Sequence, residues 1–268
     1  MTQSIAFASL KGGVGKTTVA LNSAYAFARR GARTLLVDAD PQGAVGLSLE
    51  GVGDRPGLAG RLDVEGPLLE GVVKTRLAEL DLLPTGPISG FDADNYVALA
   101  RERDLMRTVV EEGERLYDVV IFDTPAGLGG MTRLVFEATA HVIAVVQCEP
   151  LSLRAMPALL ETLARLAEAG SVCTLLGVVG SMSSFRDPVV LASLEEVWSL
   201  YRDEVFDTAI PRDPAFLQAS RAGVPLGLLS RRPPPVSAVF DKLVAEIEER
   251  LGAAEEEGVD DGPIRLVD

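Results

Sequence analysis

The chain has 268 residues and a formal net charge of −14, and hydrophobic residues make up 47% of it. This length and apolar content suffice for one large α/β domain, and nothing in the sequence demands two. The acidic balance argues against a protein coated in basic surface, although a local basic patch remains compatible with it. No apolar run approaches the roughly 20 residues that a membrane span needs.

Short apolar, β-branched runs alternate with helical patterns along the chain, which is typical of βαβ units. We therefore expect an α/β fold in which helices flank both faces of a mostly parallel, twisted sheet. The expected strands cover residues 5–9, 34–38, 80–83, 119–123, 142–146 and 175–179, with a short one at 205–210. The expected helices cover residues 17–30, 104–116, 132–138, 152–169, 189–202, 214–222 and 236–251. Residues 51–71 should form loops with short helices, and residues 86–94 should form a surface loop.

We expect residues 1–252 to form this single domain and residues 253–268 to form an acidic, disordered C-terminal tail. The N-terminus shows no signal-peptide pattern, so a cytoplasmic protein is expected. The two cysteines, Cys148 and Cys173, lie far apart in apolar segments and should be buried free thiols.

The first expected strand leads into a glycine-rich loop, Ser9-Leu10-Lys11-Gly12-Gly13-Val14-Gly15-Lys16-Thr17-Thr18. Glycines let backbone N–H groups close around a triphosphate, and the N-terminus of the next helix adds partial positive charge. In such a loop Lys16 would reach the β- and γ-phosphates, and the Thr17 hydroxyl would bind Mg²⁺. The common pattern G-x-x-x-x-G-K-[ST] has glycine where this chain has Leu10, and the chain carries a second lysine, Lys11, inside the loop.

Carboxylates end two further expected strands. Asp38 and Asp40 are spaced i, i+2 at the end of the second strand, so they point the same way from the edge where open α/β sheets bind ligands. Asp123 follows four apolar residues, as expected for a strand that is buried on both faces and brings a carboxylate to a Mg²⁺ site. The sequence thus predicts three acidic groups beside the glycine-rich loop.

These motifs together resemble those of the ParA/MinD family of ATPases, and most closely the short ParA positioning ATPases. The family has a deviant loop K-G-G-x-G-K-[ST]-[ST] and a second motif D-x-D-P-Q-G, which matches Asp38-Ala39-Asp40-Pro41-Gln42-Gly43. The resemblance spans about residues 4 to 251 and implies a P-loop NTPase fold that uses ATP and Mg²⁺. It also implies that Lys11 crosses to the nucleotide of a partner subunit in an ATP-bound sandwich homodimer, where it acts as an arginine finger does.

The same resemblance assigns roles to the other site residues. Lys11, Lys16 and Asp40 would be catalytic, and Asp40 would orient or deprotonate the attacking water. Thr17, Asp38 and Asp123 would hold Mg²⁺, partly through water. A later element, Pro211-Arg212-Asp213, resembles the family's P-R-[ND] segment, which packs against adenine. The full set of expected nucleotide-binding residues is Lys11, Gly12, Gly13, Val14, Gly15, Lys16, Thr17, Thr18, Asp38, Asp123, Pro211, Arg212 and Asp213.

The function implied is slow, partner-stimulated ATP hydrolysis that positions or segregates DNA or a protein cargo through switched binding to non-specific DNA. The expected partners are a second copy of the chain, DNA, and a small ParB-like activator or cargo adaptor, and the expected location is the nucleoid. Two basic positions that contact DNA in chromosomal ParA proteins match Ala215 and Val224 here. The remaining candidates for DNA contact are Arg186, Arg221, Arg231 and Arg232.

Several alternative functions use the same loop. A MinD-like membrane switch needs a basic amphipathic C-terminal helix, whereas residues 236–251 have a Glu-rich polar face, so no membrane partner is expected. An iron–sulfur carrier needs paired cysteines, which Cys148 and Cys173 do not supply. A P-loop kinase or synthetase for a small molecule is disfavoured by Lys11 and the Asp40 motif. Positioning of an organelle or protein cluster remains the alternative cargo.

Overall fold

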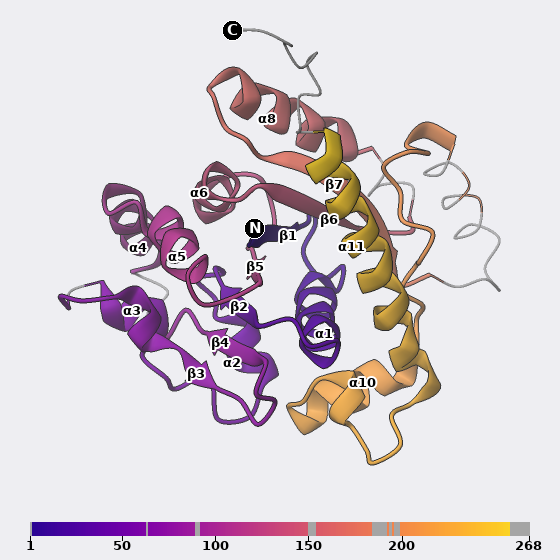
Figure 1. The fold of residues 1–268 in the computed structure, drawn as a ribbon, viewed down its shortest axis with the longest axis horizontal. Coiled ribbons are helices and arrows are strands. Elements are labelled where there is room, and N and C mark those ends of the chain that lie inside the picture. Colours follow the sequence, from indigo (N-terminus) through magenta and orange to yellow (C-terminus); the bar gives the residue numbers. More distant parts are fainter. Residues whose placement is uncertain are drawn as a thin grey trace, which may run out of the picture.

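A computed structural model describes residues 2–62, 64–88, 92–149, 154–183, 192, 195 and 199–257. In this part of the chain the strands form one seven-stranded sheet in the order β3-β4-β2-β5-β1-β6-β7 (Figure 1). The strands are β1 Gln3–Ala8, β2 Thr34–Asp38, β3 Val73–Lys74, β4 Leu80–Leu83, β5 Val119–Asp123, β6 His141–Gln147 and β7 Thr174–Ser181. Only the short edge strand β3 is antiparallel within this described sheet. The expected mostly parallel α/β fold is confirmed.

Helices cover both faces of the sheet (Figure 1). They are α1 Lys16–Arg29, α2 Ala44–Ser48, α3 Gly57–Arg61, α4 Ala93–Glu102, α5 Leu105–Gly113, α6 Gly130–Ala138, α8 Met156–Glu168, α10 Pro214–Ala222 and α11 Ala238–Glu257, with 3-10 helices η1 Leu68–Gly71, η2 Leu226–Leu228 and η3 Pro235–Ser237. One core packs α3 to α6 and α8 against the sheet, and the other packs α1, α10 and α11 against its opposite face.

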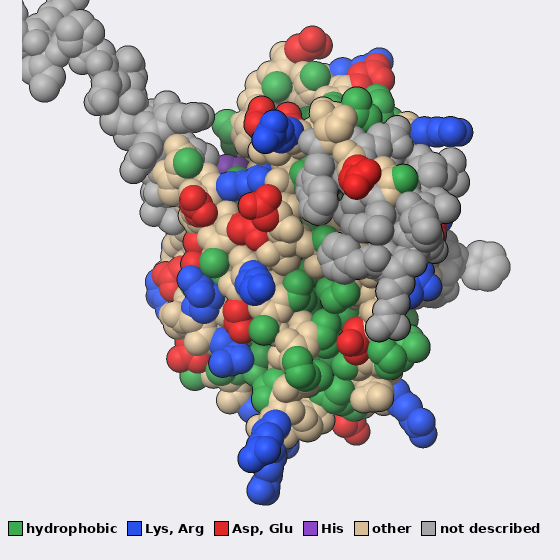
Figure 2. All heavy atoms as spheres, turned by 90° about the vertical axis from the view of Figure 1, so that its right-hand side faces the viewer, with side chains coloured by type: hydrophobic (Ala, Val, Ile, Leu, Met, Phe, Trp, Pro, Cys, Tyr) green, Lys and Arg blue, Asp and Glu red, His purple; other side chains and the backbone are tan. Residues whose placement is uncertain are grey.

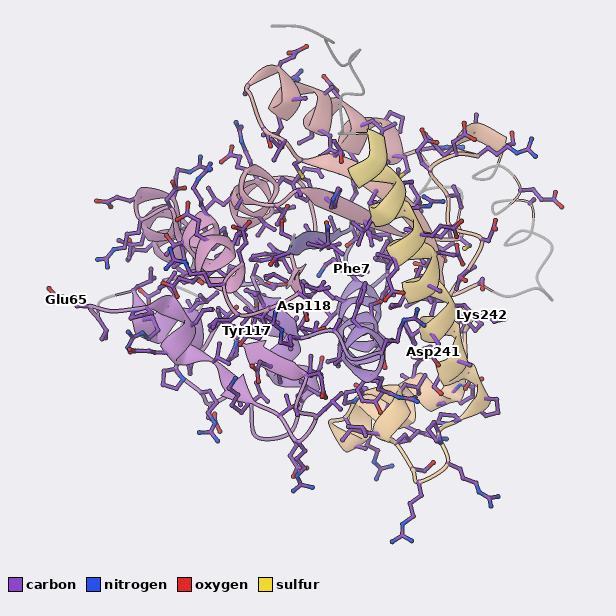
Figure 3. All side chains as sticks on the ribbon, in the orientation of Figure 1. Phe7, Glu65, Tyr117, Asp118, Asp241 and Lys242 are labelled. Carbon is purple, nitrogen blue, oxygen red and sulfur yellow. The ribbon has the colours of Figure 1, made fainter. Side chains whose placement is uncertain are left out.

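Successive side chains of a central strand point alternately into the two cores. In β1, Ala6 and Ala8 face the first core, whereas Ile5 and Phe7 face the second. This is the period of two that a pleated strand imposes, and every one of these side chains is buried. Figure 3 shows Phe7 in the interior, whereas Asp241 and Lys242 lie on the outer helix α11. The central strands are thus buried on both faces, and their carboxyl ends are fixed beside one another.

The expected strand at 205–210 is wrong. Val205 and Pro211 make only isolated bridges to Val178 and Ser183 of the β7 region. Between these bridges the Glu246 carboxylate accepts the backbone N–H of Asp207 at 2.7 Å. It also accepts the backbone N–H of Thr208 at 3.0 Å. A side chain of α11 therefore takes the backbone donors that a continuous ladder would need.

Other differences concern boundaries and missed elements. Helix α4 begins inside the segment expected as a loop at 86–94, and α2 and β3 were not expected at all. Helix α11 continues to Glu257, past the expected end of the domain at residue 252, and residues 258–268 lie outside the described part. Most of the expected helix 189–202 also lies outside it.

Both cysteines are free and buried, as expected. Burial raises the pKa of the Cys148 thiol and that of the Cys173 thiol to about 11, so both stay protonated at neutral pH. An iron–sulfur cluster is held by several cysteine thiolates, and the sequence supplies only these two cysteines, far apart in the chain.

Arg250 joins α11 to the irregular segment that follows β7. Its guanidinium donates to the carbonyls of Leu176 at 3.0 Å and Glu204 at 2.7 Å. It donates to the Val205 carbonyl at 2.6 Å and lies 4.1 Å from the centre of the Phe206 ring. One side chain thus donates to three backbone carbonyls of two separate segments, although the Glu204 carbonyl also accepts the Val178 N–H at 2.7 Å.

We expect Arg250→Met to lower the free energy of unfolding by about 2–4 kcal/mol, because three carbonyls lose the hydrogen bonds that the guanidinium donates. Urea denaturation measures the change. The matched control is Arg165→Met, which removes an exposed i, i+4 ion pair with Glu161 and should cost less than about 0.5 kcal/mol. Equal stability of the two variants would contradict this role for Arg250.

Candidate functional site

The glycine-rich loop joins β1 to α1 and leaves the N-terminus of α1 facing outward. Gly13 and Gly15 have φ of +77° and +85°, a left-handed conformation that glycine adopts without strain. Gly15 is the N-cap of α1, and the loop is held from the side by the Ser181 hydroxyl, which donates to the Val14 carbonyl at 2.7 Å. The first N–H groups of a helix have no intrahelical partner, so this loop can accept an anion.

Lys16 lies inside the site. Its Nζ is 2.6 Å from Oδ1 of Asp123 at the end of β5, and both side chains are buried, with 7% and 0% exposed. Burial raises the pKa of Asp123 above its usual value, while the charge of Lys16 and hydrogen bonds from Lys16 and Thr17 oppose that rise. The structure therefore brings Lys16, Thr17 and Asp123 together, as the sequence predicts.

Asp38 and Asp123 are register neighbours on the parallel strands β2 and β5. The Asp38 carboxylate accepts backbone N–H groups of Asp40 at 3.2 Å, Val45 at 2.9 Å and Gly46 at 3.2 Å, which fixes the turn into α2. Burial, and then the charge of Asp123, raises the pKa of Asp38 to about 7, although the three hydrogen bonds oppose the rise. Two buried carboxyl groups thus lie side by side at the carboxyl edge of the sheet, and Lys16 contacts that of Asp123.

Asp40 is half-buried at the mouth of the site, and its negative charge contributes to the raised pKa of Asp123. Its Oδ1 accepts the backbone N–H of Gln42 at 2.9 Å. The buried Thr85 hydroxyl donates to the carbonyls of Asp38 at 2.5 Å and Asp40 at 2.9 Å, so this turn is anchored by the segment just after β4. Sequence reasoning missed Thr85, since no pattern marks a residue so distant in the chain.

The acidic groups suit a divalent cation. Asp123 Oδ2 is buried and accepts no hydrogen bond. A buried carboxylate oxygen without a partner is available to bind a metal ion. No group of three or more Asp, Glu, His or Cys side chains forms a metal cage among the described residues. Mg²⁺ in nucleotide sites is held by one or two carboxylates together with phosphate oxygens and water, and Asp123 with the Thr17 hydroxyl fits that requirement.

Lys11 has a different partner from that of Lys16. Its Nζ is 3.3 Å from Oε2 of Glu149, and the two side chains are 45% and 40% exposed. The other carboxylate oxygen of Glu149 accepts the Gln147 amide at 2.6 Å. The two lysines of one loop therefore take different positions, with Lys16 against the buried carboxylates and Lys11 at the surface. Glu149 was not among the predicted site residues.

The predicted adenine element lies beside the loop. Pro211 forms a bridge with Ser183, and the backbone N–H of Arg212 donates to the Ser183 carbonyl at 2.9 Å. Asp213 is the N-cap of α10, and its carboxylate accepts the Ala215 N–H at 2.8 Å.

Met182, just past β7, lies between this element and the loop. Its φ of +51° is rare for a residue with a side chain. An Arg212 Nη atom lies 3.8 Å from its sulfur, and a Cβ built on Gly15 would lie 3.8 Å from its methyl carbon. No sequence signal pointed to Met182.

Three of the four predicted DNA-contact arginines lie in one segment. Arg221 is in the last turn of α10, Arg231 and Arg232 follow η2, and all three are exposed. Arg186 lies outside the described residues. Ala215 is buried at the start of α10 and Val224 is half-buried, so neither offers a surface contact. Figure 2 shows basic side chains that project at the lower edge of the face over α10 and α11.

Comparisons with known proteins identify the family of this chain. A family model described as an AAA domain matches residues 2–172. The chain is 33% identical to the sporulation initiation inhibitor protein Soj of Bacillus subtilis, over 87% of this chain and 93% of Soj. It is also 33% identical to the chromosome partitioning protein ParA of Caulobacter vibrioides, over 83% of this chain and 85% of ParA.

Among solved structures, the fold is similar to that of cobyrinic acid a,c-diamide synthase from Mycobacterium smegmatis with bound ATP analog and magnesium. The TM-score is 0.75 at 27% identity, and the match covers 95% of this chain and 97% of that one. The family model and both relatives match most of the chain. The chain belongs to the ParA/MinD family of P-loop ATPases.

Proposed function

We propose that this protein is a ParA-like ATPase that dimerises around ATP and positions or segregates a cargo by switched binding to non-specific DNA. The observation that carries the proposal is that the two lysines of the loop lie in different environments. Lys16 is buried against Asp123, whereas Lys11 is half-exposed at the edge of the same loop. A surface lysine beside the phosphate site is available to a second subunit, which is what a catalytic cation supplied in trans requires.

Within one subunit, the N-terminus of α1 and Lys16 would bind the phosphates, and the ammonium would exchange its contact with Asp123 for phosphate oxygens. Thr17 and Asp123 would hold Mg²⁺, with Asp38 acting through water, because the Asp38 carboxylate already accepts three backbone N–H groups. Bound Mg²⁺ neutralises phosphate charge. Asp40, half-buried at the mouth, would orient the attacking water.

The resulting hydrolysis would be slow and stimulated by a small ParB-like activator or cargo adaptor. Pro211 and Arg212 would pack against adenine beside Met182. Arg221, Arg231 and Arg232 would contact DNA phosphates in the dimer, which would associate the protein with the nucleoid in the cytoplasm. The similarity to the chromosome partitioning protein ParA favours a chromosome or plasmid as cargo, and a protein cluster is the alternative.

Switched binding to a membrane is less well supported than switched binding to DNA. The apolar stripe of α11, which includes Phe240, Leu243 and Ile247, is buried in the second core. The described helices include none that is long and apolar enough to cross a bilayer. A MinD-like mechanism would need a free amphipathic face, and this stripe does not provide one.

Lys11→Ala tests the sandwich dimer. We expect the variant to retain ATP binding, because Lys16 and the α1 N-terminus are unchanged, and to dimerise with ATP at least about 100-fold more weakly, since two trans contacts are lost. Analytical ultracentrifugation with ATP measures the association. The control is Lys242→Ala, which removes an exposed lysine of α11. An ATP-bound Lys11→Ala protein that dimerises as the control does would refute the trans role.

A further inference from the structure

We propose that Glu149 holds Lys11 within its own subunit and thereby restrains dimerisation, so that each subunit must release this ion pair before Lys11 can cross. The inference rests on the proposed function, in which Lys11 acts across the dimer. It adds Glu149 as a positioning residue that sets how readily the ATP-bound dimer forms.

Both carboxylate oxygens of Glu149 are engaged. Oε2 is 3.3 Å from Lys11 Nζ, and Oε1 accepts the Gln147 amide at 2.6 Å. Gln147 is the last residue of β6 and is only 8% exposed, so its amide is a fixed donor. The carboxylate is therefore oriented by a buried neighbour before Lys11 reaches it.

The backbone on both sides of the ion pair is tied to the end of β7. The backbone N–H of Cys148 donates to the Ser181 carbonyl at 3.2 Å. The Ser181 hydroxyl donates to the Val14 carbonyl of the loop at 2.7 Å. One residue thus fixes the loop that carries Lys11 and the segment that carries Glu149. This shared anchor distinguishes the pair from two long surface side chains that meet by chance.

The ion pair and the trans contact are mutually exclusive. An ammonium that bonds Glu149 of its own subunit cannot at the same time contact the phosphates of a second subunit. An exposed pair of this kind shifts an equilibrium by roughly 1.5- to 5-fold. Because a dimer releases two such pairs, the restraint on dimerisation should be about 2- to 25-fold.

The test compares dimerisation of the full-length Asp40→Ala protein with and without Glu149→Gln, by analytical ultracentrifugation in ATP. Glutamine keeps an oxygen for the Gln147 amide but removes the charge that holds Lys11. We expect the association constant to rise about 2- to 25-fold. The matched control is Glu248→Gln on α11, which breaks an ion pair with Arg30, the residue after α1; the two side chains are 39% and 41% exposed, nearly as in the Lys11 pair. It should leave dimerisation unchanged.

An unchanged or weaker association in Glu149→Gln would overturn the proposal. An Asp40→Ala parent that forms no dimer with ATP would instead overturn the proposed function, so the two failures are distinguishable. A general electrostatic effect of removing one negative charge would tighten ADP binding by the monomer as much as it tightens dimerisation. The proposal requires the gain in dimerisation to exceed any gain in ADP affinity.

A second readout tests the monomer directly. In the nucleotide-free protein, trace acetylation followed by mass spectrometry reports the reactivity of Lys11 relative to that of Lys242. A salt-bridged ammonium is shielded from the reagent, so we expect Lys11 to react several-fold faster in Glu149→Gln. Equal relative rates in the two proteins would show that Glu149 does not hold Lys11.

Discussion

Replacement of Lys16 with alanine should weaken ATP binding at least about 100-fold, which corresponds to about 2.7 kcal/mol. Lys16 is buried at the base of the loop, and its ammonium lies 2.6 Å from the Asp123 carboxylate. The charge-assisted contacts with the phosphates cannot be replaced by water in such an enclosed position. Titration with a fluorescent ATP analogue measures the loss, and binding within a few-fold of the parent would contradict the role.

The same substitution should destabilise the protein, because it leaves Asp123 buried without its cation. Loss of one partner of a buried pair costs about 3 kcal/mol. The raised pKa of Asp123 gives the sign of the pH dependence. A carboxyl group whose pKa is higher in the folded than in the unfolded state binds protons more tightly when folded, so stability should recover as the pH falls.

The double variant Lys16→Ala/Asp123→Asn separates folding from binding. Removal of both charges should restore most of the free energy of unfolding, as measured with urea, because no unpaired buried charge remains. ATP binding should stay lost. If the double variant were as unstable as Lys16→Ala alone, the loss of stability would not come from Asp123.

Asp40→Ala should lower the rate of ATP hydrolysis at least about 100-fold and leave an ATP-bound dimer. The side chain makes one local hydrogen bond to the backbone of Gln42, while Thr85 and Asp38 hold the surrounding turn. The substitution should therefore remove the group that orients water without disturbing the phosphate site. Phosphate release measures the rate.

The matched control for this effect is Asp54→Ala, which removes an exposed carboxylate beyond α2. It should hydrolyse ATP at the parental rate. Parental turnover in Asp40→Ala would remove Asp40 from the mechanism, and failure of that variant to bind ATP would show that its side chain is structural.

Local patterns predicted the parts of the site that lie in one stretch of chain. The loop at residues 9–18, the pair Asp38 and Asp40, and Asp123 each follow a buried strand, and strand ends in a parallel sheet meet at one edge. That these motifs converge could therefore be predicted from the strands that precede them in the sequence. The structure bears this out in the contact of Lys16 with Asp123 and in the register of Asp38 with Asp123.

Contacts between distant segments could not be predicted in the same way. Glu149 meets Lys11, and Thr85 meets the turn after β2, across long separations in sequence that leave no periodic signal. The wrong strand at 205–210 has the same origin. Its apolar residues fit a strand, but the Glu246 carboxylate of α11 accepts the backbone N–H groups of Asp207 and Thr208, and the pairing with β7 is interrupted there. Tertiary partners decided these local structures.

The most direct test of the central claim is binding of the Asp40→Ala protein to non-specific duplex DNA, with ATP or ADP, across a salt series. The proposed function predicts binding with ATP alone that weakens steeply with salt, as phosphate contacts require. It also predicts that Arg231→Ala/Arg232→Ala reduces both the affinity and the salt dependence. Absence of DNA binding in every nucleotide state, in a protein shown to form the ATP-bound dimer, would contradict DNA as the matrix for this switch.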